Sequence, residues 1–137
     1  MPKRDVFHDT VKRILIADGW SITHDPLVLP FGRRNVYVDL GAELPIGAEK
    51  AGRRIAVEVK SFLGVSDLRD LEQALGQFAL YRFLLAREDP DRVLFLAITR
   101  GACENLFEDA AGRELAASEK LRLLVFDPET ERLLEWI

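Results

Sequence analysis

Two short apolar segments of the chain carry charged side chains at their ends. Asp39 ends one run of strand-forming residues, and Glu58-Val59-Lys60 ends another, with Glu58 19 residues after Asp39. Because side chains alternate along a strand, Glu58 and Lys60 would share one face of a sheet, opposite Val59. If the two strands pair, two carboxylates and one ammonium group converge on that face. Such a set can hold a hard divalent cation beside a lysine, which is a standard arrangement for metal-assisted phosphodiester hydrolysis.

A predicted helix that follows these segments adds two polar side chains. Ser66 is a suitable N-cap, and the helix is expected to reach about Glu88, with Pro90 after its end. Gln77 and Tyr81 are four residues apart, so both can point from the helix towards the sheet. The same pattern also fits the polar edge of an ordinary helix.

Three further positions could belong to the site or to the framework of the fold. Two of them have both interpretations, and the third is expected to be structural only. His8 is either a partly buried packing residue or a member of the site. Glu43 shares strand parity with Asp39, so it is either an additional ligand or the solvated end of a strand. His24-Asp25-Pro26 is expected to form a structural turn in which the backbone caps the histidine.

The periodicity of apolar residues predicts a mixed α/β sandwich with one central sheet and the element order α-β-β-β-α-β-α-β-β. Its expected helices are 5–18, 66–88 and 102–118, the last one broken or divided around Gly112; its expected strands are 20–23, 35–43, 53–60, 92–99, 121–126 and 131–137. The connection 45–52 has room for one short extra strand. The apolar stripes expected to face the sheet are Phe7, Val11, Ile14 and Leu15 in the first helix and Leu68, Leu71, Leu75, Phe78 and Leu85 in the second. The strand 92–99 is apolar enough to be a parallel strand covered on both faces.

The composition is typical of a soluble globular protein, expected to be a single domain over residues 1–137. Hydrophobic residues are 48% of the chain, yet no apolar run approaches the ~20 residues that cross a bilayer, so no membrane contact is expected. The N-terminal residues lack the apolar segment of a secretory signal. The single cysteine, Cys103, cannot form an intramolecular disulfide, which suits a cytoplasmic protein, and it is expected to pack in a helix.

Charge is distributed unevenly along the chain. The net charge of −4 argues against a general nucleic-acid-binding protein. Residues 1–60, however, carry ten Lys/Arg and eight Asp/Glu, whereas residues 61–137 carry nine against fifteen. The basic excess therefore falls in the half that holds Asp39 and Glu58, where it could hold a phosphate backbone. The alternative is that these cations lie on solvated strand edges.

Asp39, followed by Glu58-Val59-Lys60 on the next strand and then by a helix, resembles the core of the PD-(D/E)xK nuclease superfamily. Val38 stands where that superfamily usually has proline. The resemblance implies a restriction-endonuclease-like α/β sandwich whose central mixed sheet is flanked by helices. It also implies that both carboxylates and the Val59 carbonyl hold Mg²⁺ or Mn²⁺. Lys60 would orient or deprotonate the attacking water, or balance charge on the phosphate.

The helix residues sharpen this resemblance. Gln77 and Tyr81 match the Gln-x-x-x-Tyr pattern of the RecB-type branch. Nucleases of that branch also place a histidine before the aspartate, a role that His8 could fill. By this resemblance Gln77 would position water or phosphate, and Tyr81 would pack against or bond to the ligand carboxylates.

The whole chain is similar to the XisH-like fdxN element excision controlling factors. That family is linked to control of a site-specific DNA excision, a recombination event, in cyanobacteria, and is associated with a small XisI-like partner protein. The similarity implies DNA and the small protein as partners and leaves a homo-oligomer open. The matching segments spread over nearly the full length and are 4–8, 19–27, 38–43, 55–64, 74–77 and 125–130.

Three functions fit these patterns. The first is a metal-dependent DNA endonuclease, whose sequence specificity would have to come from a partner because the chain has no separate DNA-recognition module. The second is a non-catalytic regulatory subunit that keeps a nuclease fold and acts through the small partner. The apolar strand 131–137 would then be a contact edge, although it could equally pack on its own domain. The third is a toxin-like nuclease that the small partner neutralises.

Overall fold

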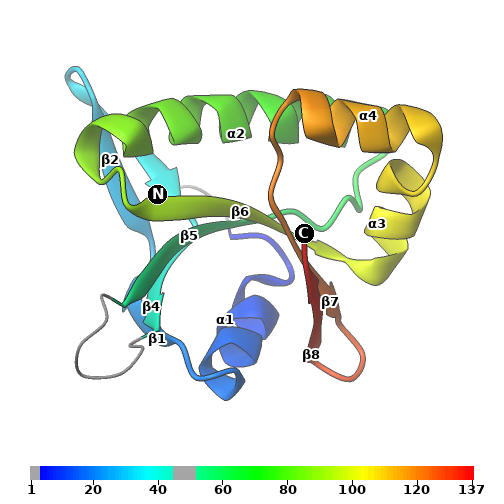
Figure 1. Cartoon of the computed structure of the whole chain (residues 1–137), viewed down its shortest axis with the longest axis horizontal. Coiled ribbons are helices and arrows are strands. Elements are labelled where there is room, and N and C mark those ends of the chain that lie inside the picture. Colours follow the sequence, from blue (N-terminus) through cyan, green and yellow to red (C-terminus); the bar gives the residue numbers. More distant parts are fainter. Residues whose placement is uncertain (1–3, 45–51) are drawn as a thin grey trace.

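Helices cover both faces of a six-stranded sheet (Figure 1). A computed structural model of the chain describes residues 4–44 and 52–137. One helix packs on one face and three pack on the other, in two separate apolar cores. The first is α1 (His8–Ala17), and the other three are α2 (Asp67–Glu88), α3 (Arg100–Phe107) and α4 (Ala110–Ser118).

The sheet has the strand order β1-β4-β5-β6-β7-β8. The pairs β5–β6 and β6–β7 are parallel and the remaining pairs are antiparallel, so the predicted α/β class with a mixed central sheet is confirmed. The predicted strand 92–99 is β6, which is buried from Leu94 to Ile98. The six strands are β1 (Ser21–His24), β4 (Leu40–Leu44), β5 (Arg53–Val59), β6 (Arg92–Thr99), β7 (Leu123–Asp127) and β8 (Arg132–Trp136).

The expected element order is wrong in the N-terminal half, because the predicted strand 35–43 is divided at Asp39. Its first part is β3 (Arg34–Val38), which pairs with β2 (Leu27–Phe31) in a separate two-stranded sheet. Its second part is β4, which pairs with β5. The segment β2 was not expected as a strand; it contains Pro30, which cannot donate a hydrogen bond to a ladder. Residues 45–51 of the predicted connection lie outside the described residues.

The predicted third helix is two helices, which separate just before Gly112. Asp109 caps α4 by accepting a hydrogen bond from the Gly112 N–H (2.9 Å). A Cβ atom at Gly112 would lie 1.9 Å from the Leu106 carbonyl oxygen. The glycine therefore permits the close approach of α3 and α4.

The alternation predicted for β5 is confirmed by the packing of its two faces. Ala56 belongs to the core under α2, whereas Val57 and Val59 belong to the core over α1. The predicted stripe of α1 is confirmed for Val11, Ile14 and Leu15, which are buried, with Phe7 packed beside them. The face of α2 buried on the sheet consists of Leu71, Ala74, Phe78, Tyr81, Leu84 and Leu85.

Two details of α2 separate its first turn from the rest. Ser66 caps the helix as predicted, since its hydroxyl accepts a hydrogen bond from the Arg69 N–H (3.2 Å). Leu68, predicted to face the sheet, is 62% exposed, because burial on α2 begins only at Leu71.

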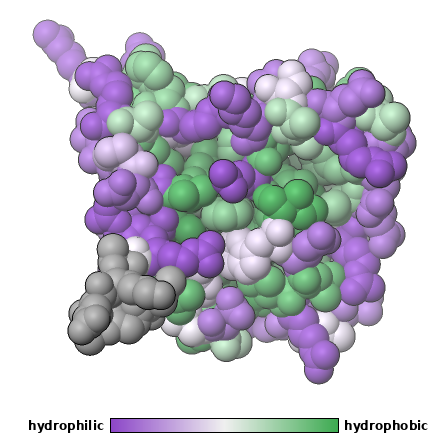
Figure 2. All heavy atoms as spheres, viewed as in Figure 1, coloured by the Kyte–Doolittle hydropathy of each residue, from purple (hydrophilic) through white to green (hydrophobic). Residues whose placement is uncertain are grey.

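The surface of the molecule seen from the side of Figure 1 has apolar side chains gathered in its middle, within a ring of hydrophilic side chains (Figure 2). Among the described residues no helix is long and apolar enough to cross a membrane.

Candidate functional site

Asp39 lies at the junction where the chain passes from β3 to β4. The register of β4 and β5 places Leu40 opposite Val57, so Asp39 falls beside the end of β5. Its backbone N–H donates to Glu58 Oε1 (3.2 Å), and its Oδ2 accepts a hydrogen bond from the Val59 N–H (2.8 Å). The two carboxylates therefore lie side by side as predicted, but the Lys60 ammonium, predicted to join them, forms no ion pair with either one among the described residues and contacts amide oxygens of α2 (Asp67–Glu88). Because the N–H and C=O of a strand residue point to the same side, the Val59 carbonyl also faces this edge.

Lys60 follows directly after β5 and points to α2. Its backbone N–H continues the ladder to the Ala97 carbonyl (3.0 Å), which fixes the start of the side chain. Its ammonium Nζ donates to Gln77 Oε1 (3.1 Å) and to Gln73 Oε1 (3.2 Å). Gln77 therefore lies where it was predicted, on the sheet side of α2. Gln73 was missed, although its position one helical turn before Gln77 could have indicated it.

Tyr81 completes the wall of the site on α2. The residue is 7% exposed and belongs to the core between α2 and the sheet. Burial raises the pKa of its phenol above the ordinary value, and the nearby charges of Glu58 and Asp39 raise the pKa further. The phenol is thus a neutral hydrogen-bond donor close to both carboxylates.

The two carboxylates are in an environment that does not tolerate two negative charges. Burial raises the pKa of Glu58 to about 9, and the charge of Asp39 adds to this effect. Burial also raises the pKa of Asp39, although the hydrogen bond from Val59 and the nearby His8 oppose it. The pair therefore holds a proton at neutral pH unless a cation takes its place.

His8 lies in the first turn of α1 and is 3% exposed. Its Nε2 is 2.7 Å from Asp25 Oδ1, and its Nδ1 is 3.9 Å from Asp39 Oδ1. Among the buried side-chain nitrogen and oxygen atoms of the described residues, Nδ1 of His8 is the one that has no hydrogen-bond partner. The structure thus brings His8 next to Asp39, as the interpretation of His8 as a member of the site required.

Asp25 is a neighbour of the site that sequence reasoning did not find. The turn predicted at His24-Asp25-Pro26 is present, but His24 Nδ1 contacts the Thr23 hydroxyl (2.8 Å) and not the backbone. Asp25 instead faces α1. Burial opposes its ionisation, but hydrogen bonds from Lys12 and His8 prevail and lower the pKa of Asp25. Nothing in the local sequence indicated this contact, since it joins residues 17 positions apart.

Two other candidates lie away from the site. The Glu43 side chain is 44% exposed, and its carboxylate is 3.7 Å from Arg92 Nη2 at the opposite end of β5 and β6. Of the two interpretations of Glu43, the structure therefore supports the solvated strand end and not the additional ligand. Cys103 is buried in α3 and packs in the core, as predicted.

The donor atoms at the site suit a hard cation that keeps some of its water ligands. They do not form a metal centre closed by protein side chains alone. The described residues include no group of three or more His, Cys, Asp or Glu side chains that could hold a metal ion by themselves. Asp39 and Glu58 supply oxygen donors, and the Val59 carbonyl faces the same edge. Mg²⁺ commonly binds through one or two carboxylates while it keeps several water molecules. The two carboxylates together with water therefore fit Mg²⁺ or Mn²⁺, and the buried, unpaired Nδ1 of His8 lies beside them, 3.9 Å from Asp39 Oδ1.

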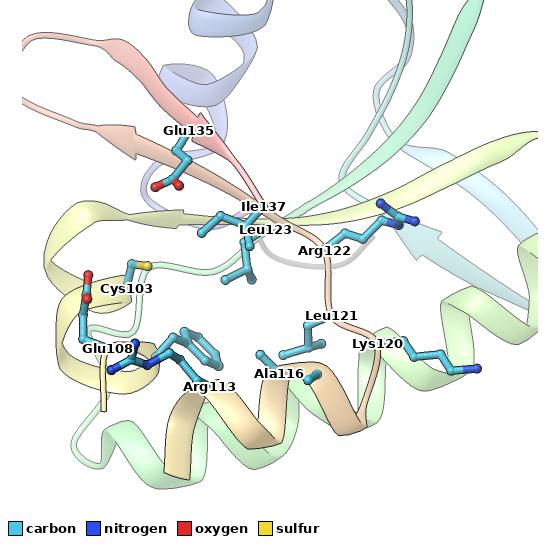
Figure 3. A pocket seen from close by; sticks show the side chains of 12 residues that line it. Cys103, Glu108, Arg113, Ala116, Lys120, Leu121, Arg122, Leu123, Glu135 and Ile137 are labelled. Carbon is cyan, nitrogen blue, oxygen red and sulfur yellow. The ribbon is translucent and has the colours of Figure 1, made fainter. Parts of the chain in front are cut away.

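A separate cavity of about 640 Å³ lies between α3, α4 and the ends of β7 and β8 (Figure 3). Apolar side chains such as Leu121, Leu123 and Ile137 line its middle. The side chains of Lys120 and Arg122 extend outward from it. None of the residues predicted to carry chemistry lines this cavity.

Comparisons with known proteins agree along nearly the whole chain. A family model described as XisH protein matches residues 1–134. The crystal structure of an XisH family protein from Nostoc punctiforme is 40% identical, covers 97% of this chain and 99% of its own, and superposes with a TM-score of 0.86. That of an fdxN element excision controlling factor protein from Anabaena variabilis is 41% identical, covers 98% and 99%, and has the same TM-score of 0.86. No curated protein matches the chain. The chain belongs to the XisH family.

Proposed function

We propose that this protein is a metal-dependent DNA endonuclease of the PD-(D/E)xK type, which hydrolyses phosphodiester bonds in a single restriction-endonuclease-like domain. The observation that carries the proposal is that the buried Glu58 and the half-buried Asp39 lie side by side, with the charge of Lys60 close enough to act on Glu58. A structural sheet has no use for a buried carboxylate beside a half-buried one, because desolvation and mutual repulsion both disfavour them. Strongly perturbed carboxyl groups gathered at the end of a strand are typical of functional sites.

The cation would be Mg²⁺ or Mn²⁺, held by Asp39, Glu58 and the Val59 carbonyl, with His8 Nδ1 as a further donor. When bound, such an ion supplies Lewis-acid stabilisation of the phosphate and a more acidic water. Binding would displace the proton that the carboxylate pair holds at neutral pH, so affinity should rise with pH.

The remaining side chains would act on water and phosphate. Lys60 would place a positive charge where the phosphate gains negative charge, or orient the attacking water. Gln77 and Gln73 support this role, since their amide oxygens hold the Lys60 ammonium within 3.2 Å. Tyr81, neutral because its pKa is raised, would donate a hydrogen bond towards the carboxylates.

The biological setting that we propose is DNA excision, a recombination process. The name of the similar Anabaena variabilis protein, an fdxN element excision controlling factor, supports this setting. The net charge of −4 disfavours tight unassisted binding to DNA. We therefore propose that a small XisI-like partner brings the site to its DNA.

The test is cleavage of single-stranded, duplex and branched DNA with Mg²⁺ or Mn²⁺, with and without the small partner. Wild type should cut in a metal-dependent manner, and Lys60→Ala should not. Lys120→Ala is a matched control, because Lys120 is an exposed lysine far from the carboxylates, at the rim of the cavity under α4. Folded wild-type protein that cuts none of these DNAs, with the partner present, would refute the nuclease.

A second candidate is a non-catalytic regulatory subunit that works through the small partner. The observation in its favour is that β8 is an edge strand of the sheet, on which Leu134 and the following Ile137 are 37% and 51% exposed. Leu134→Arg should then abolish complex formation. Val93→Arg, at a similarly exposed apolar position on β6, should leave the complex intact. Equal binding by both variants would count against this edge as the contact surface.

A further inference from the structure

The imidazole of His8 lies between two carboxylates that it contacts very differently. On one side Nε2 is 2.7 Å from Asp25 Oδ1, a hydrogen bond of normal length. On the other side Nδ1 is 3.9 Å from Asp39 Oδ1, too far for a hydrogen bond. With the ring only 3% exposed, no bulk water reaches Nδ1, and it has no partner among the described residues. One ring nitrogen is held by a hydrogen bond, and the other has none.

Asp25 is held in place as an ionised acceptor. Lys12 Nζ donates to its Oδ2 (2.8 Å), and Arg4 Nη2 lies 3.4 Å from its Oδ1. A carboxylate can only accept hydrogen bonds, so Nε2 of His8 must carry the proton in this contact. In the neutral imidazole, Nδ1 then presents a lone pair towards Asp39.

We propose that Asp25 is a positioning residue: it fixes the ring and the tautomer of His8 so that Nδ1 and Asp39 Oδ1 share one cation, and it thereby favours Mn²⁺ over Mg²⁺. This inference rests on the metal site of the proposed function. Nδ1 of His8 and Oδ1 of Asp39 are 3.9 Å apart, which is too far for a hydrogen bond between them but close enough for both atoms to reach one cation.

The selectivity follows from the type of donor. Mg²⁺ prefers oxygen ligands, whereas transition metals accept imidazole nitrogen more readily. A carboxylate that takes the other ring N–H raises the basicity of the ligating nitrogen and sets its direction. Loss of Asp25 should therefore weaken Mn²⁺ binding more than Mg²⁺ binding.

The simpler alternative is that the Asp25–His8 contact only ties α1 to the turn before β2. In that case Asp25→Ala would lower the free energy of unfolding, but the folded protein would bind Mn²⁺ like wild type. Metal affinity and the spectrum of the bound ion therefore distinguish positioning from mere support.

The experiment uses the full chain and Mn²⁺ alone, with affinity from titration calorimetry and ligand identity from pulsed EPR. Wild type should show coupling of Mn²⁺ to an imidazole ¹⁴N that is lost in His8→Gln. Asp25→Ala should lose the coupling and about 10–100-fold in Mn²⁺ affinity, with a smaller loss for Mg²⁺. Asp25→Asn, whose amide oxygen can still accept from Nε2, should be intermediate and covers the case in which the alanine variant does not fold. Asp9→Ala is the control, because Asp9 is an exposed carboxylate on α1 that contacts Arg4 and not His8.

Each outcome decides between the two proposals. If wild type binds Mn²⁺ through Asp39 but shows no imidazole coupling, the role of Asp25 is refuted and the nuclease proposal stands. Unchanged Mn²⁺ affinity and coupling in folded Asp25 variants would have the same meaning. If wild type binds neither ion, both proposals fall.

Discussion

The two ends of the paired strands β5 and β6 hold charged clusters of opposite character. At the start of the strands Arg92 is 6% exposed and donates to Asp89 (3.0 Å) and to the Ile55 carbonyl (2.9 Å), with Glu43 3.7 Å away. Arg54 pairs with the same Asp89. Two cations thus face three anions, since Arg54 is also 4.0 Å from Asp91, and the buried charge of Arg92 has opposite partners.

At the opposite end, where β5 and β6 finish, the charges are not paired in this way. Asp39 and Glu58 lie together, and the Lys60 ammonium donates to two amide oxygens. His8 Nδ1, which lies beside Asp39, has no hydrogen-bond partner in the described part of the chain. Paired buried charges are compatible with a purely structural role, but unpaired ones lower stability unless a ligand completes them. The difference indicates function at the second end and structure at the first.

The largest expected effect separates the two ends by activity. Glu58→Gln should reduce single-turnover cleavage by roughly 10⁴-fold, about 5.5 kcal/mol in the transition state, because the amide is a poor ligand. Its free energy of unfolding at neutral pH should stay the same or rise, since a buried titratable group is removed. Glu43→Gln is the matched control, because Glu43 lies on the neighbouring strand β4 at the other end of β5, and this variant should cut like wild type. Equal loss in both variants would mean that the two ends do not differ.

The next effect reverses the pattern. Arg92→Leu should lower the free energy of unfolding by about 3–5 kcal/mol, because Asp89 and the Ile55 carbonyl lose a buried partner. Cleavage per folded molecule should not change. Urea denaturation, with the rate measured at saturating metal, checks both statements. A loss below about 1 kcal/mol would show that this cluster is not structural.

Short-range geometry explains what could be predicted of the site. The alternation of Glu58 and Lys60 and the four-residue spacing of Gln77 and Tyr81 depend only on the period of a strand or helix. Both patterns held in the structure, because α2 is regular through Gln77 and Tyr81, and the Lys60 N–H continues the ladder just after β5 ends at Val59.

Long-range contacts explain what could not be predicted. The alternation of β-forming residues runs through Asp39 without a break, so the change from one sheet to the other had no local signal. Asp25 meets His8 only because α1 packs beside the turn before β2. Partners of this kind depend on how elements assemble, which no local period records.

The pH dependence of stability is a smaller test of the unbalanced end. The Glu58 pKa is about 9 in the folded protein against 4.5 for an ordinary glutamate. Between these values the folded state holds a proton that the unfolded chain lacks, so the free energy of unfolding should fall as pH rises and level off above about pH 9. The slope should reach up to about 1.4 kcal/mol per pH unit in wild type. Denaturation of Glu58→Gln over the same range should lack this slope, and an unchanged slope would assign it to another group.

The smallest expected effect concerns the cavity under α4 (Figure 3). Its volume of about 640 Å³ would suit a ligand, but the charged residues around it are exposed and impose no desolvation cost. Ala116→Leu places bulk in this space and should leave cleavage and Mn²⁺ affinity within about twofold of wild type, because a remote and uncoupled site adds less than about 0.5 kcal/mol. Cleavage rates and calorimetric titration of the variant test this. A large loss of cleavage with metal affinity intact would show that the reaction depends on the cavity under α4 as well as on the site at Asp39 and Glu58. The contrast between buried and exposed charge would then no longer locate the functional site.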